Sequence, residues 1–302
     1  MNKDKFGLYA SLPTEQINKN TQDIDRVSLE EVLIKLNRED ITVPKAVGKE
    51  IKNIASGAKL ISKAFLNGKN IFFIGAGTSG RLGVLEASEL PPTYGVEPDR
   101  FTAIMAGGEK AVFMSKEGAE DIYEDGKKEI LKRAKKGDIV IGIAASGVTP
   151  YVQGAMDAAI KKGAKTIFVT CNKKSKPKSA QVIIAADVGP EPINGSTRMK
   201  SGTATKLILN MLTTSAMVIS GKVYKNWMVD LKKTSFKLKM RCERITAQIC
   251  GISPKEAEKI LKKTDYRVKE AIVVCKLKTD VKKAALLLKK HKGFLKDIIE
   301  KK

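Results

Sequence analysis

The sequence predicts an α/β fold in which helices cover both faces of a parallel sheet, giving three layers. Between residues 71 and 219, short apolar segments alternate with longer helical patterns, as they do in successive βαβ units. The segment Ile71–Ile74 is apolar at every position. Such a strand is expected at the centre of a parallel sheet, where both faces are buried.

The expected elements follow the chain in order. An irregular arm over residues 1–20 precedes a short helix over Ser28–Leu36, with Ser28 as its N-cap, and a longer helix over Pro44–Leu66. Strands are expected at Ile71–Ile74, Phe101–Met105, Ile139–Ala144, Thr166–Thr170 and Val182–Ala185. Helices are expected from Ser79 to the double proline Pro91–Pro92, and at Ser115–Ala134, Thr149–Lys162 and Thr203–Ile219.

The C-terminal part has a different pattern, with helical segments only after Met228. Three of these are expected at Ser253–Lys262, Arg267–Lys276 and Asp280–Lys290, followed by a last short helix. We therefore predict four regions. They are an N-terminal arm and helices packing on the core (1–68), an α/β domain (69–222), a linking helix (223–249) and a small three-helix domain (250–302).

Composition excludes several classes of protein. The 302 residues are 42% hydrophobic, which is typical of a globular chain, and no apolar run approaches the ~20 residues that span a bilayer. The N-terminus lacks a signal-peptide core, and the four cysteines form no CxxC pair, so we expect free thiols and a cytoplasmic protein. With a single histidine, His291, a histidine-based metal site or a Ser-His-Asp triad is not expected.

The net charge of +23 raises the question of nucleic acid as a partner. The excess is spread along the chain, consists mostly of lysine, and is mixed with acidic residues on amphipathic segments. Aromatic residues make up only 5% of the chain, so stacking platforms for single strands are not evident. We expect solvated lysine faces that steer an anionic substrate, and neither nucleic acid nor membrane as a partner.

A glycine- and hydroxyl-rich turn follows the first strand. Gly75, Gly77 and Gly80 let the backbone turn and approach a ligand, while Thr78 and Ser79 add hydroxyl groups at the start of a helix. Free N–H groups and the helix dipole make such a position a natural phosphate site. The same glycines fit the dinucleotide fingerprint GxGxxG, but no acidic residue follows the second strand where a ribose would need one, so a phosphate monoester is favoured over NAD.

Two later loops share this chemistry. One carries Ser146 and Thr149 after the third strand, and the other carries Ser196 and Thr197 after the fifth. Loops at the carboxyl ends of parallel strands converge on one crevice, so we predict a sugar-phosphate pocket. Ser146 and Thr149 as simple helix caps remain the alternative, although capping and ligand binding are compatible.

Three glutamates lie near these loops. Glu86 and Glu89 are on the helix predicted after the first strand, where Glu89 is expected in the last turn, a position that the helix dipole disfavours for an acid. Glu120 is expected one turn inside the helix that begins at Ser115. A single glutamate is more often a solvated surface residue, and spacing alone does not select a catalytic one.

The motifs together resemble the N-acetylmuramic acid 6-phosphate etherase family over nearly the whole chain. They are LPTEQINKNTQDID, GAGTSGRLGVLEASELPPTYGV, AGGEKAV, EGAED, GIAASGVTPYV and GSTRMKSGTATKLILNML. The resemblance implies a sugar isomerase (SIS) domain with a small C-terminal helical domain. It also implies cleavage of the lactyl ether of N-acetylmuramic acid 6-phosphate, a phosphorylated amino sugar, to N-acetylglucosamine 6-phosphate and D-lactate.

The resemblance assigns catalytic roles to Glu120, which removes the C2 proton of the open-chain sugar, and to Glu89, which protonates the departing lactate. Water then adds at C3, and no metal or other cofactor is implied. The phosphate-binding positions implied are Thr78, Ser79, Gly80, Ser146 and Thr149, with Ser196 and Thr197 closing the sugar site.

One position departs from the family pattern SGRTPY: Val148 stands where the arginine is usual. If that arginine faces phosphate, affinity should fall unless a lysine substitutes; if it points outward, nothing changes.

The helix geometry bears on the assembly. A regular helix places Ser79 and Glu89 about 15 Å apart, farther than a hexose phosphate reaches. Either the helix folds back at Gly83 or the pocket is shared between subunits, and we favour a homodimer.

Two other functions fit the same residues. A sugar-phosphate isomerase would share the phosphate loops and the proton transfer at C2 but release no lactate. A non-catalytic sugar-phosphate sensor could dispense with Glu89 and Glu120, which are both present, and a transcriptional sensor would need a helix-turn-helix module that the N-terminal region does not offer.

Overall fold

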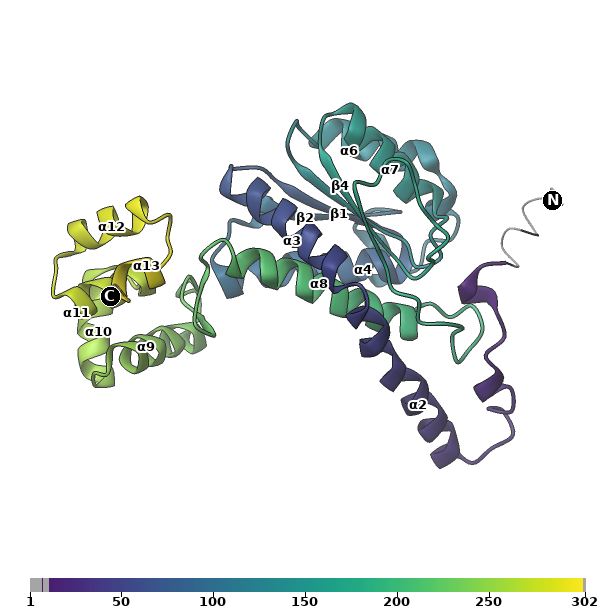
Figure 1. The fold of residues 1–302 in the computed structure, drawn as a ribbon, viewed down its shortest axis with the longest axis horizontal. Coiled ribbons are helices and arrows are strands. Elements are labelled where there is room, and N and C mark those ends of the chain that lie inside the picture. Colours follow the sequence, from purple (N-terminus) through teal and green to yellow (C-terminus); the bar gives the residue numbers. More distant parts are fainter. Residues whose placement is uncertain (1–6, 8–10, 301–302) are drawn as a thin grey trace. The chain divides into compact units, whose positions relative to one another are not determined.

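The computed structural model describes Gly7 and residues 11–300, so most of the first half of the predicted arm lies outside the described residues. The chain divides into two compact units (Figure 1). Unit 1 comprises residues 1–87 and 101–213, and unit 2 comprises residues 88–100 and 214–302. Each unit has a hydrophobic core of its own.

Unit 1 contains a five-stranded sheet in which every neighbouring pair is parallel. Its strands are β1 (Ile71–Gly75), β2 (Phe101–Met105), β3 (Ile139–Ile143), β4 (Lys165–Thr170) and β5 (Val182–Ala185). The predicted strands are therefore confirmed to within one residue at each end. The order β2-β1-β3-β4-β5 changes direction between β1 and β3, and ligands bind at the carboxyl edge beside such a point in open α/β sheets.

Helices cover both faces of this sheet, which confirms the three layers (Figure 1). On one face, α6 (Tyr123–Arg133) and α7 (Pro150–Lys161) bury alternate strand residues such as Phe72 and Val140. On the other face, the helix residue Gly57 of α3 (Ile51–Leu66) lies against Ile167 of β4. Two long helices complete the set, α4 (Gly77–Tyr94) and α8 (Lys200–Val218).

The N-terminal helices differ from the prediction. A single helix, α2, runs from Leu29 to Gly48 and includes Pro44, which was expected to begin the next helix. Ser28 does cap α2, because its hydroxyl accepts the N–H of Glu31 at 3.3 Å. Burial of Val43 and Val47 on both sides of Pro44 explains why the helix continues in spite of the lost backbone hydrogen bond.

Two further helix boundaries were predicted wrongly. The helix α4 does not end at Pro91–Pro92 but continues to Tyr94, and it is one uninterrupted helix through Gly83. The segment expected as a helix from Ser115 starts only at Tyr123, after a short 3-10 turn at Ala119–Asp121. Gly118 has φ = 75°, a left-handed conformation that breaks a helix at that point.

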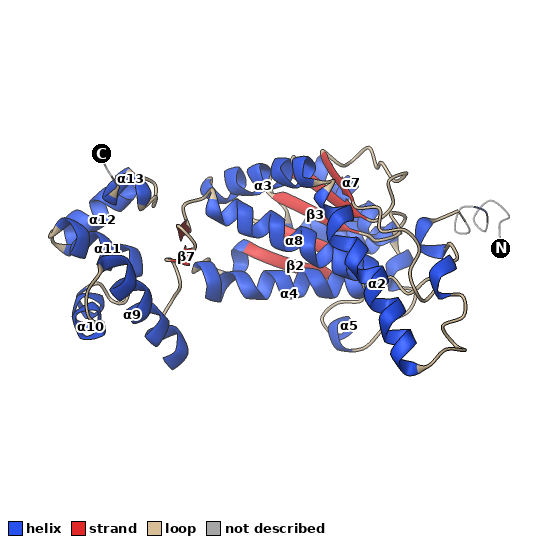
Figure 2. Cartoon of the chain, turned by 60° about the horizontal axis from the view of Figure 1, so that its bottom comes forward, coloured by secondary structure: helices blue, strands red, loops and turns tan. Residues whose placement is uncertain are grey.

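Unit 2 is mainly helical, as predicted, and adds a two-stranded hairpin that the sequence pattern did not reveal (Figure 2). Its elements after α8 are β6 (Val223–Tyr224), β7 (Trp227–Met228), α9 (Phe236–Cys250), α10 (Pro254–Lys263), α11 (Val268–Leu277), α12 (Val281–Lys290) and α13 (Lys296–Ile299). Buried residues of α9, including Cys242 and Ile245, share a core with α11 residues such as Ile272. The small three-helix domain expected at residues 250–302 stays a prediction.

Candidate active site

A pocket of about 520 Å³ lies in unit 1, beside the carboxyl ends of β1 and β2. Three segments line it: the β1–α4 turn, the segment between β2 and α6, and the loop before α8. The lining residues are Ala76, Gly77, Thr78, Arg81, Met105, Ala106, Ala111, Ser115, Lys116, Glu117, Gly118, Ala119, Glu120, Gly195, Ser196, Thr197 and Arg198. The first and third hydroxyl loops predicted from the sequence therefore meet Glu120 at one pocket.

The β1–α4 turn supplies Thr78 and the backbone of Gly77, whose φ of 51° favours glycine. Gly80 is buried, and a Cβ there would lie 2.8 Å from the Gly75 carbonyl oxygen. The structure thus gives Gly80 a packing role, because its missing side chain lets α4 start directly against β1. Neither Gly80 nor Ser79 is among the lining residues.

Arg81 connects the turn to the second segment. Its Nε donates to the carbonyl of Val112 at 2.8 Å, and its Nη2 donates to the carbonyl of Ala111 at 2.9 Å. Those carbonyls belong to the short helix α5 (Lys110–Phe113). Arg81 therefore fixes the chain that leads toward Glu120 while it lines the pocket itself.

Glu120 lies in the 3-10 turn Ala119–Asp121 at the pocket wall. Ala119 anchors this turn, because it is buried in the core of unit 1. Desolvation raises the pKa of the Glu120 carboxyl, and the negative charges of Asp121 and Glu117 raise it further. Glu120 is exposed at the pocket wall, and its raised pKa lets it hold a proton at higher pH than an ordinary glutamate, which is the direction that general acid–base catalysis requires.

The loop before α8 brings Ser196 and Thr197 to the pocket, both half-buried. Gly195 precedes them with φ = 75°, and the N–H of Ser196 is bonded to the Ile193 carbonyl at 3.0 Å. This tight turn, followed by the start of α8 at Lys200, places two hydroxyl groups and Arg198 at the wall.

The second loop is not among the lining residues of this pocket. Ser146 accepts the N–H of Val148 at 3.5 Å, and its carbonyl accepts Asn172 Nδ2 at 2.9 Å. Thr149 occupies the N-cap position of α7 without a side-chain capping bond, so the structure does not show the cap that was the alternative. Val148 does not line the pocket either.

The other two glutamates have different surroundings. Glu89 is exposed, belongs to unit 2 and is not among the lining residues. Glu86 is buried, forms an ion pair with Lys206 at 2.9 Å, and accepts a hydrogen bond from the Thr213 hydroxyl. That network gives Glu86 a structural role between α4 and α8.

Sequence reasoning missed three charged residues that accompany Glu120 at the pocket. They are the cations Lys116 and Arg198, and the acid Glu117. Arg198 stands inside the GSTRMK motif, but nothing in the local pattern selects Lys116. Among the described residues, no group of His, Cys, Asp and Glu side chains is arranged to hold a metal ion. In the same part of the chain, no helix combines the length and apolar character that crossing a membrane requires.

Residues 53–160 match the family model described as the glucokinase regulatory protein N-terminal SIS domain. This match and the parallel sheet with a pocket at its carboxyl edge identify the protein as one that contains an SIS domain. A solved phosphoheptose isomerase from Neisseria gonorrhoeae is similar over 63% of this chain and 100% of its own, with 18% identity and a TM-score of 0.49. This similarity does not indicate which reaction the chain catalyses.

Similarity to curated proteins is much higher. An N-acetylmuramic acid 6-phosphate etherase of Clostridium botulinum (strain Okra / Type B1) is 51% identical over 295 residues, covering 96% of both chains. Another, from Oceanobacillus iheyensis, is 47% identical over 287 residues, covering 94% of this chain and 98% of the relative. The chain belongs to the N-acetylmuramic acid 6-phosphate etherase family, which confirms the resemblance seen in the motifs.

Proposed function

We propose that this enzyme cleaves the D-lactyl ether of N-acetylmuramic acid 6-phosphate, giving N-acetylglucosamine 6-phosphate and D-lactate in the recycling of cell-wall amino sugars. The observation that carries the proposal is the 51% identity over nearly the full length of a protein with this name. The pocket supports it, because hydroxyl groups, cations and a carboxylate gather there. An anionic sugar with hydroxyl groups matches that set of partners.

The reaction is an elimination followed by hydration. Glu120 takes the C2 proton of the open-chain aldehyde, the C3–O bond breaks, and Glu89 donates a proton to the lactate oxygen. Water then adds at C3 of the unsaturated aldehyde, its hydroxyl going to C3 and a proton to C2. The raised pKa and the pocket position support Glu120 as the base, whereas Glu89 rests on the ASELPP motif alone.

The residues proposed to bind substrate are also supported in two ways, some by the pocket and the others by the family motifs alone. The pocket supports Thr78, Ser196 and Thr197 as contacts, and the family motifs alone suggest Ser79, Gly80, Ser146 and Thr149. The cations Lys116 and Arg198 at the wall suit an anionic substrate. We further propose a cytoplasmic homodimer.

The decisive experiment is lactate release from N-acetylmuramic acid 6-phosphate. Wild type should release lactate, and Glu120→Gln and Glu89→Gln should each lose about 10²–10⁴-fold in rate, the usual contribution of a general acid or base. Glu124→Gln is the matched control, because Glu124 is an exposed α6 glutamate paired with Lys127 outside the pocket.

No release from a folded wild type that still binds a phosphosugar would refute the etherase. Interconversion of aldose and ketose phosphates would then identify an isomerase, and binding without turnover would identify a sensor.

A further inference from the structure

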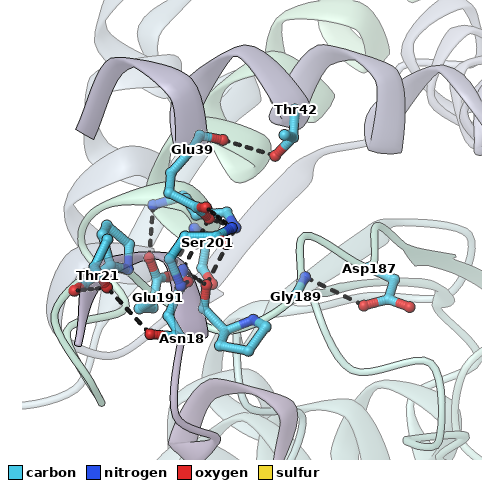
Figure 3. Close-up of polar contacts among 12 residues, drawn as sticks. Asn18, Thr21, Glu39, Thr42, Asp187, Gly189, Glu191 and Ser201 are labelled. Atoms are coloured by element: carbon cyan, nitrogen blue, oxygen red, sulfur yellow. Dashed lines mark hydrogen bonds and ion pairs between the residues drawn. The ribbon is translucent and has the colours of Figure 1, made fainter. Parts of the chain in front are cut away.

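The N-terminal segment 14–21 lies along the chain that leads into the pocket loop, and we refer to it as the strap (Figure 3). The Thr21 hydroxyl donates to the Pro192 carbonyl at 2.8 Å, and Asn18 Nδ2 donates to the Pro190 carbonyl at 3.2 Å. In the other direction, Asn194 Nδ2 donates to two strap carbonyls, and the Gly195 N–H donates to the Thr14 carbonyl at 3.2 Å. These contacts end at Gly195, directly before Ser196.

A buried ion pair fastens the strap to α2 and α8. Lys200 Nζ lies 2.6 Å from Glu39 Oε2, and both side chains are less than a tenth exposed. Asn18 Nδ2 also donates to Glu39 Oε2 at 2.8 Å. Burial alone would raise the pKa of Glu39, but the hydrogen bonds from Lys200, Asn20 and Asn18 outweigh it and hold that pKa below its ordinary value.

The loop is also closed at its base (Figure 3). Glu191 is fully buried, and its carboxylate accepts the N–H groups of Lys200 at 2.8 Å and Ser201 at 2.9 Å. A carboxylate on the first N–H groups of α8 is favourable at that end of a helix. Lys200 Nζ additionally donates to the Pro190 carbonyl at 3.1 Å. Both ends of the segment 192–199 are therefore held by buried polar groups.

We propose that Asn18, Glu39 and Lys200 are positioning residues that hold this loop so that Ser196, Thr197 and Arg198 form one wall of the substrate pocket. The inference rests on the proposed function for the identity of the substrate. The physical basis is that a buried network of charged and amide groups restricts the segments that it joins. Here the hydrogen-bond partners come from the strap, α2 and α8, so the network fixes the loop between them. Ser196, Thr197 and Arg198 line the pocket, while the residues directly before them are hydrogen-bonded to the strap.

The test compares two asparagines of the strap. The Asn18 side chain donates to Glu39 and to the Pro190 carbonyl and accepts the N–H of Asn20 at 3.0 Å, whereas the Asn20 side chain bonds to Glu39 alone, at 2.8 Å, and is exposed. Asn18→Ala should raise KM for N-acetylmuramic acid 6-phosphate about tenfold with kcat nearly unchanged, since lost ground-state positioning appears in KM. Asn20→Ala should change KM by less than about twofold.

A second readout does not depend on the reaction. Arg198 is exposed in the loop, so trypsin can cut after it, and mass spectrometry can follow that one cut. Asn18→Ala should accelerate this cut about tenfold, while the cut after exposed Lys136, in the loop before the amino end of β3, serves as the internal reference. Asn20→Ala should cut at the wild-type rate.

An unchanged KM in Asn18→Ala would overturn the proposal, as would equal KM effects of Asn18→Ala and Asn20→Ala. Unchanged cutting after Arg198 would also overturn it, because the loop would then be held without Asn18. If wild type releases no lactate, the proposed function fails, and the cutting rates still decide whether Asn18 holds the loop.

Discussion

At the residue scale, Glu120 lies in a short 3-10 turn and has two acidic residues near it, Glu117 and Asp121. Its side chain reaches the pocket wall, and the charges of Asp121 and Glu117 add to desolvation in raising its pKa. Asp121 does not line the pocket, so it can be changed without removing a pocket contact. This separation makes the electrostatic role of one neighbour measurable.

The proposed role of Glu120 as a base requires the deprotonated carboxylate, so we expect the acid limb of the kcat/KM profile to lie above the ordinary pKa of a glutamate. Asp121→Asn removes a negative charge that raises the pKa of Glu120. The pKa should therefore fall and the acid limb should move to lower pH. The profile of Glu124→Gln should match wild type, and an acid limb that stays in place in Asp121→Asn would contradict the assignment.

The residues of the candidate site show how much of it the sequence predicts. Spacing predicted hydroxyl groups at the carboxyl edge of the sheet, and Thr78, Ser196 and Thr197 do meet there. Glu120 entered through a family motif, because its place in the pocket depends on a break at Gly118 and on the burial of Ala119, which no local pattern encodes.

At the element scale, the junction of β1 and α4 depends on two glycines. A Cβ on Gly80 would lie 2.7 Å from Met105 Cγ and 2.8 Å from the Gly75 carbonyl oxygen, and the second of these is backbone. The sequence indicated Gly80 as part of a ligand turn. The structure shows close packing of helix on strand at Gly80, which is the role of the third glycine in fingerprints of this spacing.

Gly80→Ala should therefore destabilise unit 1 by about 1–3 kcal/mol, as overpacking of a tight contact does. Urea unfolding of the two proteins measures the difference as a lower midpoint at an unchanged slope. Gly48→Ala is the control, because a Cβ at Gly48 would meet nothing within 4 Å. A Gly80→Ala midpoint equal to that of wild type would show that α4 can shift away from β1 at little cost.

Strands were predictable and helix ends were not, for a physical reason. A central strand such as β1 is apolar throughout, so the sequence marks it directly. Helix ends depend on tertiary packing: Pro44 stays inside α2 because Val43 and Val47 are buried around it. A proline rule based on local hydrogen bonding cannot include that contribution.

At the scale of the whole molecule, the proposed mechanism needs both Glu120 and Glu89 at one substrate, yet Glu89 does not line the pocket that contains Glu120. Glu89 is ten positions after Ser79, so in a regular helix the two residues lie about 15 Å apart. The fold-back at Gly83 that would shorten this distance is absent, because α4 is uninterrupted. This is the reason to propose a homodimer in which each pocket uses residues of both subunits.

Mixed dimers test that assembly. If the pockets are shared, a subunit with Glu89→Gln and a subunit with Glu120→Gln form a dimer with one intact site and one doubly altered site. Random pairing makes about half of the dimers mixed, so activity should return to about a quarter of wild type, although each variant alone is inactive. Pairing Glu120→Gln with Ser196→Ala is the control, because both residues line the same pocket and mixing should add nothing. Mixed dimers of the first pair that stay inactive would mean that Glu89 and Glu120 act within one subunit, and the homodimer would then need another reason.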